Sequence, residues 1–141
     1  MTCLVDSNVW IEFFNKKKFF DFISGLLIHN TAVTNKIILA ELLPSVRSKK
    51  EREFIDCISG IESIPLSIDW DEISEIQFQS IRHGINKLGL LDIAIAQNAG
   101  QNGLTVVSIN RHMLLLCEML GINKVLHHSN QFLWLEKSHP P

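Results

Sequence analysis

Three carboxylates lie among apolar neighbours, where a globular chain seldom places a charge: Asp6, Glu41 and Asp92. Asp6 directly follows the apolar run Cys3 to Val5. Taken singly, Asp6 and Asp92 could each cap the helix that follows, and Glu41 could take one outward position on a mostly buried helix. If the fold brings the three together, their mutual repulsion raises their pKa values unless a cation neutralises them.

A carboxylate cluster of this kind predicts a hard divalent ion. Oxygen ligands select Mg²⁺ or Mn²⁺, and magnesium usually keeps several waters beside one or two carboxylates. Such an ion polarises a phosphoryl oxygen, activates a bound water and stabilises a leaving oxygen. The three side chains therefore favour phosphodiester hydrolysis.

The elements that must position these residues alternate along the chain. Short apolar runs predict strands at 3–5, 32–33, 63–66, 104–109 and 125–126. Helical spacing of apolar residues predicts helices at 8–14, 35–43, 49–59, 70–87, 91–101 and 111–120. Strands that alternate with helices predict an α/β fold with a parallel sheet, in which functional residues gather beyond the carboxyl ends of the strands.

Composition excludes several classes of protein. The chain has 141 residues, 46% of them hydrophobic and 20% charged, with a net charge of −2, so it is neither a disordered chain nor a uniformly basic nucleic-acid coat. Its three cysteines are more than fifty residues apart, which argues against a disulfide framework or a thiolate zinc site. We expect one domain over 1–136 with a loose tail over 137–141, no membrane span, and a cytoplasmic protein.

Four segments, in this order and at this spacing, resemble the PIN-domain family and within it the VapC-type toxins of toxin–antitoxin pairs. They are Asp6-Ser7-Asn8-Val9-Trp10-Ile11, Leu39-Ala40-Glu41-Leu42, the stretch from Gly89 to Ala96, and the stretch from Leu104 to Met113. The resemblance implies a three-layer α/β/α fold with a five-stranded parallel sheet, and a Mg²⁺- or Mn²⁺-dependent endoribonuclease. The partners it implies are an RNA substrate, a cognate antitoxin and an identical subunit in a homodimer.

The resemblance also implies roles for individual residues. Asp6, Glu41 and Asp92 resemble the acidic metal ligands of the family, and Ser7 and Ser108 occupy places where relatives often have a small hydroxyl group. Ser108 could equally cap the helix that follows it.

Asn110 departs from the pattern, because it stands where many relatives have a fourth acid. Its amide oxygen can still assist at the catalytic site, but it supplies no negative charge, so a second metal position should be weaker.

Two arginines are candidate contacts for an RNA backbone. Arg47 begins a segment with four positive charges in six residues, and Arg82 precedes the segment that carries Asp92. A solvated helix start explains the first segment equally well. Five phenylalanines lie within residues 13–22 and predict an exposed apolar interface.

Two other functions fit parts of the sequence. A binding module with this fold but little turnover, acting through RNA or protein contacts, is suggested by Asn110 and by the acidic net charge. A phosphoacceptor domain of receiver type also has an aspartate after its first strand, but it needs an acidic pair there, and here Ser7 follows Asp6.

Overall fold

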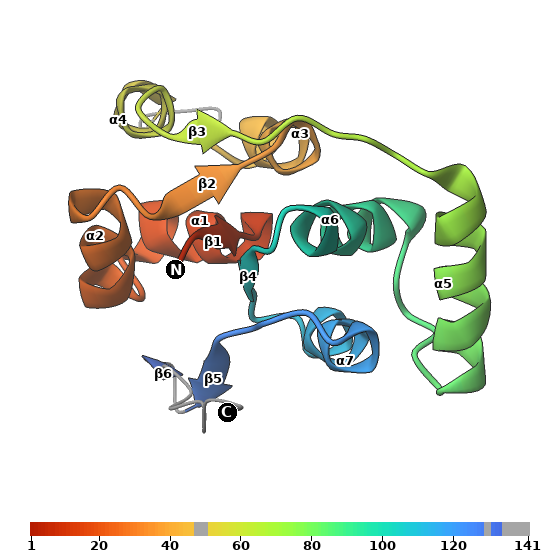
Figure 1. Cartoon of the computed structure of the whole chain (residues 1–141). Coiled ribbons are helices and arrows are strands. Elements are labelled where there is room, and N and C mark those ends of the chain that lie inside the picture. Colours follow the sequence, from red (N-terminus) through yellow and green to blue (C-terminus); the bar gives the residue numbers. More distant parts are fainter. Residues whose placement is uncertain (47–50, 129–130, 134–141) are drawn as a thin grey trace.

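The computed structural model describes residues 1–46, 51–128 and 131–133 of the chain. Four parallel strands form the main sheet, in the order β3-β2-β1-β4 (Figure 1). They are β1 (Cys3–Val5), β2 (Ala32–Thr34), β3 (Glu62–Ser63) and β4 (Thr105–Val107). In the register of the sheet, Leu4 lies opposite Val33 on one side and Val106 on the other. The predicted α/β fold with a parallel sheet is confirmed, and its first strand is central.

The position of the predicted fifth strand holds a single parallel bridge between Val106 and Lys124. The N–H of Val125 donates to the carbonyl of Val106 over 3.0 Å, which continues the sheet by one residue. Beyond it, β5 (Leu126–His128) pairs antiparallel with β6 (Gln131–Leu133). The chain therefore reaches the fifth position and then turns into a hairpin.

Helices lie on both sides of the sheet, with α5 outermost against α6 (Figure 1). The described helices are α1 (Ser7–Lys16), α2 (Phe20–Ile28), α3 (Lys36–Ser45), α4 (Glu51–Ile58), α5 (Trp70–Arg82), α6 (Leu90–Gln101) and α7 (Arg111–Leu120). Six of them fall within or close to the predicted segments, and α2 is the one that was not predicted. None of the helices in the described ranges is long and apolar enough to cross a membrane.

Helix α5 ends five residues earlier than predicted. Ile73, Ile76 and Ser80 are buried along one face, as the spacing indicates. The backbone then turns at Gly84, whose φ of 75° is the left-handed region that favours glycine, and the N–H of Ile85 returns to the carbonyl of Ser80 over 2.8 Å. This turn stops the helix, although the apolar periodicity continues.

The core lies between the sheet and the helices. Strands β1 and β4 are completely covered, because every residue of both is buried. Helix α6 contributes a continuous buried stretch over residues 93–99, and its small alanines let it approach the sheet closely. The largest fully buried side chains include Trp10, Phe54, Leu4, Ile38, Leu42, Ile93, Ile95, Met113 and Leu116.

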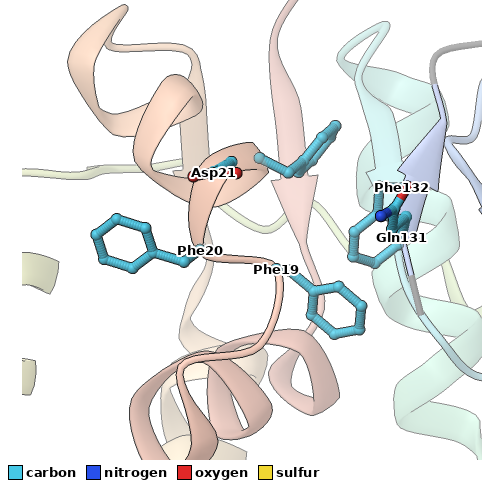
Figure 2. A pocket seen from close by; sticks show the side chains of 6 residues that line it. Phe19, Phe20, Asp21, Gln131 and Phe132 are labelled. Carbon is cyan, nitrogen blue, oxygen red and sulfur yellow. The ribbon is translucent and has the colours of Figure 1, made fainter.

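The phenylalanine-rich segment packs largely on other aromatic side chains of the protein and is less exposed than predicted. Phe14 is buried and stacks on Trp10, and Phe19 meets Phe132 of β6 with ring centroids 4.6 Å apart. Figure 2 shows Phe19 and Phe132 beside a hollow at the start of α2, with Phe20 turned away from both. Of the five phenylalanines only Phe20 is largely exposed, at 55%.

Candidate active site

Asp6 lies where β1 ends and α1 begins, and its carboxylate is only 4% exposed. One oxygen, Oδ1, accepts a hydrogen bond from the N–H of Ser7 over 2.8 Å, so Asp6 caps α1. The other, Oδ2, accepts from the hydroxyl of Ser108 over 2.9 Å and from the amide of Asn8 over 3.3 Å. Both roles considered for Asp6 thus meet in one side chain: it caps a helix and stands at the carboxyl edge of the sheet.

Ser108 connects this corner to the end of β4. Its buried hydroxyl group donates to Asp6 and accepts from the N–H of Asn110 and from the amide of Asn8, each over 3.1 Å. A serine hydroxyl has one donor and two acceptor sites, so its hydrogen bonding is complete. The alternative role of Ser108 as a helix cap is wrong, because Asn110 caps α7 instead.

Asn8 was not predicted as a site residue, yet it links Asp6, which follows β1, to Ser108 and Ile109, which follow β4. Its Nδ2 donates to Asp6 and to Ser108, and its Oδ1 accepts from the N–H of Ile109 over 3.3 Å. The one sequence signal for it is the run of three polar residues, 6–8, directly after a buried strand. Its partners near residue 108 are visible only in the folded chain.

Glu41 reaches the same corner from the middle of α3. Its Oε2 accepts a long hydrogen bond of 3.4 Å from the hydroxyl of Ser7, while its Oε1 is buried without a hydrogen-bond partner. The side chain is half-buried, so the alternative of an outward, solvated position is wrong. A buried carboxylate oxygen without a partner is costly, and it is open to a ligand that supplies positive charge.

Asp92 lies in the first turn of α6 and is half-buried. Its Oδ2 accepts from the N–H of Gly89 over 3.0 Å, so the capping role considered for it is present. One oxygen of the carboxylate serves the helix start, which leaves Oδ1 for another partner.

The charges of the three carboxylates act on one another. Burial raises the pKa of Asp6, and the charge of Asp92 raises it further, against the lowering effect of the hydrogen bonds from Ser108, Ser7 and Asn8. Burial also raises the pKa of Glu41, and the charges of both Asp6 and Asp92 add to this effect. The three predicted carboxylates are therefore close enough in the fold for their charges to oppose the ionisation of Asp6 and Glu41.

No basic side chain in the described part of the chain forms an ion pair with any of the three. The ion pairs present there join Glu12 to Lys16 and Lys18, and Glu118 to Lys124. Within the described residues, the repulsion among Asp6, Glu41 and Asp92 is thus not offset by a positive charge in direct contact.

A PIN-domain family model matches residues 3–117, which is most of the chain and includes all three carboxylates. The chain belongs to the PIN-domain family. No curated protein is similar enough in sequence to count as a relative.

Solved structures support the same PIN fold. A structure of FitAcB from Neisseria gonorrhoeae superposes with a TM-score of 0.64 at 18% identity, and the match covers 87% of this chain and 96% of that one. VapBC2 from Rickettsia felis, bound to a DNA fragment from its promoter, has a TM-score of 0.61 at 25% identity, covering 78% of this chain and 88% of the other. PAE2754 from Pyrobaculum aerophilum has a TM-score of 0.61 at 16% identity, over 82% of this chain and 79% of that chain.

The donor set of this PIN domain fits a hard divalent ion in chemistry. As the side chains stand, no three Asp, Glu, His or Cys groups within residues 1–46, 51–128 and 131–133 are close enough to share one ion. Magnesium, however, needs only one or two direct carboxylates and completes its shell with water. The partnerless Oε1 of Glu41 and the unpaired charge of the cluster are what such an ion would satisfy.

For the other predicted site residues, Asn110, Arg82 and Arg47, the described structure gives no side-chain contact with the three carboxylates. The side-chain oxygen of Asn110 accepts from the N–H groups of His112 and Met113, over 2.9 and 3.4 Å, so it is occupied by the start of α7. Arg82 is exposed in the last turn of α5, where its guanidinium lies 5.8 Å from the centre of the Phe78 ring, and no described contact joins it to the carboxylates. Arg47 lies outside the residues that the structure describes, as does the predicted tail.

Proposed function

We propose that this PIN domain is a divalent-metal-dependent endoribonuclease and the toxin of a type II toxin–antitoxin pair. The observation that carries the proposal is the group of three carboxylates, Asp6, Glu41 and Asp92. The charge of Asp92 raises the pKa of both Asp6 and Glu41, and no basic side chain in the described chain pairs with any of the three. The likeness to VapBC2 and FitAcB supports the toxin assignment, because both names denote toxin–antitoxin complexes. RNA as the substrate implies action in the cytoplasm.

In this proposal Asp6, Asp92 and Glu41 hold Mg²⁺ or Mn²⁺ at the carboxyl edge of the sheet. The bound ion supplies a polarised phosphoryl oxygen and an activated water. Ser108 and Asn8 keep Asp6 in place, and Ser7 makes one long hydrogen bond to Glu41. Glu41, whose Oε1 has no hydrogen-bond partner, would also take the proton from the attacking water.

Water attack on phosphorus forms one P–O bond and breaks the bond to the 3′ oxygen, which leaves with a proton. The products are a 5′-phosphate and a 3′-hydroxyl, and the RNA 2′-hydroxyl takes no part. The products therefore separate this chemistry from metal-free cleavage through a cyclic phosphate.

The test is cleavage of a structured RNA by the partner-free protein with Mn²⁺, with EDTA, and as the Asp92→Asn variant. Asparagine keeps an oxygen that can accept from the N–H of Gly89, so the variant should fold. Asp69→Asn is the matched control, because Asp69 also caps a helix by accepting from Glu72, on α5. We expect cleavage, with 5′-phosphate ends, only by the wild type and Asp69→Asn with Mn²⁺; equal cleavage in all arms would overturn the proposal.

A binding module with little turnover is the second candidate function. It is favoured by the occupied oxygen of Asn110 and by the absence, among the described side chains, of a ready three-group metal site. Calorimetry with Mn²⁺ at millimolar concentration separates the two: no binding favours the module. The antitoxin and the homodimer are tested by co-expression with the product of a neighbouring small gene and by the mass of the complex in solution.

A further inference from the structure

A pair of buried asparagines joins α3 to α6, the two helices that carry Glu41 and Asp92. Asn35 is 0% exposed and Asn98 is 1% exposed. The Nδ2 of Asn35 donates to the Oδ1 of Asn98 over 3.0 Å, across 63 residues of sequence. Buried amides are costly unless they are hydrogen-bonded, so this contact needs a reason beyond filling the core.

Each asparagine side chain also makes a second hydrogen bond, to a different part of the chain. The Oδ1 of Asn35 caps α3 by accepting from the N–H of Ile38 over 3.0 Å. The Nδ2 of Asn98 donates to the carbonyl of Pro65 over 3.0 Å. Neither side chain can therefore move without breaking a second bond, and the distance between the two helices at this point is set.

The carboxylates lie at equal distances from the pair. Glu41 follows Asn35 by six residues, and Asp92 precedes Asn98 by six, which is about 9 Å along each helix. Lys36, Ile37, Ala40 and Glu41 of α3 line the same hollow as Leu91 of α6, so the two helices lie along one another there. The charge of Asp92 also acts on Glu41, so the two carboxylates approach one another beyond the asparagine pair. Figure 1 shows α3 and α6 side by side. Each helix thus carries one carboxylate of the site, six residues from the asparagine pair.

Apolar packing alone would hold these helices together without defining how far one slides along the other, because it has no direction. A hydrogen bond requires its two atoms to lie about 3 Å apart. A single buried asparagine is known to define the register of paired helices in this way. A slip of one turn, about 5.4 Å, would carry Glu41 away from Asp92.

We propose that Asn35 and Asn98 form a positioning pair that sets the register of α3 against α6 and thereby the separation of Glu41 from Asp92. The inference rests on the proposed function, in which both carboxylates bind one divalent ion. Neither asparagine touches the ion or the RNA.

The test compares Asn98→Ala with Gln97→Ala in the full chain. Gln97 is a neighbouring buried amide on the same helix, but it bonds to Asp69 and Glu72 at the start of α5. Both variants lose buried hydrogen bonds of α6, so a purely structural effect should be common to both. Asn35→Ser is a second variant, since serine can still cap α3 but is too short to reach Asn98.

The primary measurement is Mn²⁺ affinity by calorimetry, with thermal unfolding as the check on folding. We expect Asn98→Ala and Asn35→Ser to bind Mn²⁺ roughly 10-fold more weakly or worse, as is typical when a group that supports a ligand is lost, and Gln97→Ala to bind like the wild type. Wild-type affinity in both pair variants, or an equal loss in Gln97→Ala, overturns the inference.

Crystal structures of the metal-free wild type and Asn98→Ala separate failure of this inference from failure of the proposed function. If the wild type binds no Mn²⁺, the proposed function is wrong. The role of the asparagine pair in the register of α3 against α6 is then tested by the two crystal structures alone. A shift of α3 along α6 that separates Glu41 from Asp92 supports the positioning role, and an unchanged separation contradicts it.

Discussion

The carboxylate of Asp6, at the end of β1, is held by more hydrogen bonds than the carboxylates of Glu41 and Asp92, which lie on the helices α3 and α6. Asp6 is buried and receives three hydrogen bonds from three different residues. Among the described residues, Glu41 accepts one long hydrogen bond and has a buried oxygen without a partner, and the side chain of Asp92 accepts a hydrogen bond from the N–H of Gly89 alone. One carboxylate is placed in advance, whereas the other two can adjust. This difference suits a site in which a rigid ligand defines the position of an ion and the others close around it.

Substitution at the rigid side should have the largest effect. In Asp6→Asn the oxygen that caps α1 remains, but the charge that anchors the ion is gone. We expect Mn²⁺ affinity to fall by more than roughly 100-fold, beyond the loss typical of a supporting group, with RNA cleavage lost as well. Calorimetry and a cleavage assay measure this, and a variant that binds Mn²⁺ normally would contradict the anchoring role.

Substitution at the adjustable side should affect turnover more than binding. Glu41→Gln keeps an oxygen that can accept from Ser7 but can no longer take a proton from water. We expect kcat to fall roughly 100-fold, the usual size for a lost general base, while Mn²⁺ affinity falls less than in Asp6→Asn. Equal losses of affinity in the two variants would remove the contrast between rigid and adjustable ligands.

Substitution of Ser108, which donates a hydrogen bond to Asp6, should lower Mn²⁺ affinity less than substitution of Asp6 itself. Ser108→Ala leaves Asp6 with two hydrogen bonds and removes the acceptor of the Asn110 N–H. We expect about a 10-fold weaker Mn²⁺ affinity and a stability loss of about 1 to 3 kcal/mol. Ser108→Thr, which retains the hydroxyl group, is the control and should recover affinity; failure to do so would show that shape, not the hydrogen bond, is what counts.

The smallest expected effect is on the pH dependence of stability without metal. Raised pKa values in the folded state mean that Asp6 and Glu41 hold protons more tightly there than in the unfolded chain. The free energy of unfolding should therefore fall as pH rises from the ordinary aspartate value of 3.8 through the raised values. Denaturant unfolding of wild type and of Asp6→Asn/Glu41→Gln checks this: the double variant should lose the decline, and Mn²⁺ should offset it in the wild type only.

The sequence was sufficient for elements with a clear local pattern. The buried run before Asp6 and the apolar spacing around Ile73 and Ile76 correctly indicate a strand and a helix. Helix α2 was missed because it is apolar on nearly all sides, contains Gly25, and starts after Phe19 in a left-handed conformation instead of a capping residue. The final hairpin was missed because β5 and β6 pair with each other and not with the sheet.

At the site, residue type and position predicted the three carboxylates and Ser108 but not their supports. Asn8 and Asn35 look like ordinary helix-start residues in the sequence, and Asn98 lies in a helical stretch without distinction. Their partners lie 100 and 63 residues away, so only tertiary packing reveals them. Asn110 illustrates the converse: its type predicts a place at the catalytic site, while its side-chain oxygen accepts from the start of α7 and only its backbone N–H reaches Ser108.

The central place of β1 in the sheet bears on how the protein is made. Strand β1 is synthesised before both of its neighbours in the sheet, and one of them, β4, follows about a hundred residues later. Since Asp6 meets Ser108 only when β4 has docked, every shorter nascent chain lacks the assembled corner. The assembled site therefore forms only after the chain has been made as far as Ser108, beyond the end of β4.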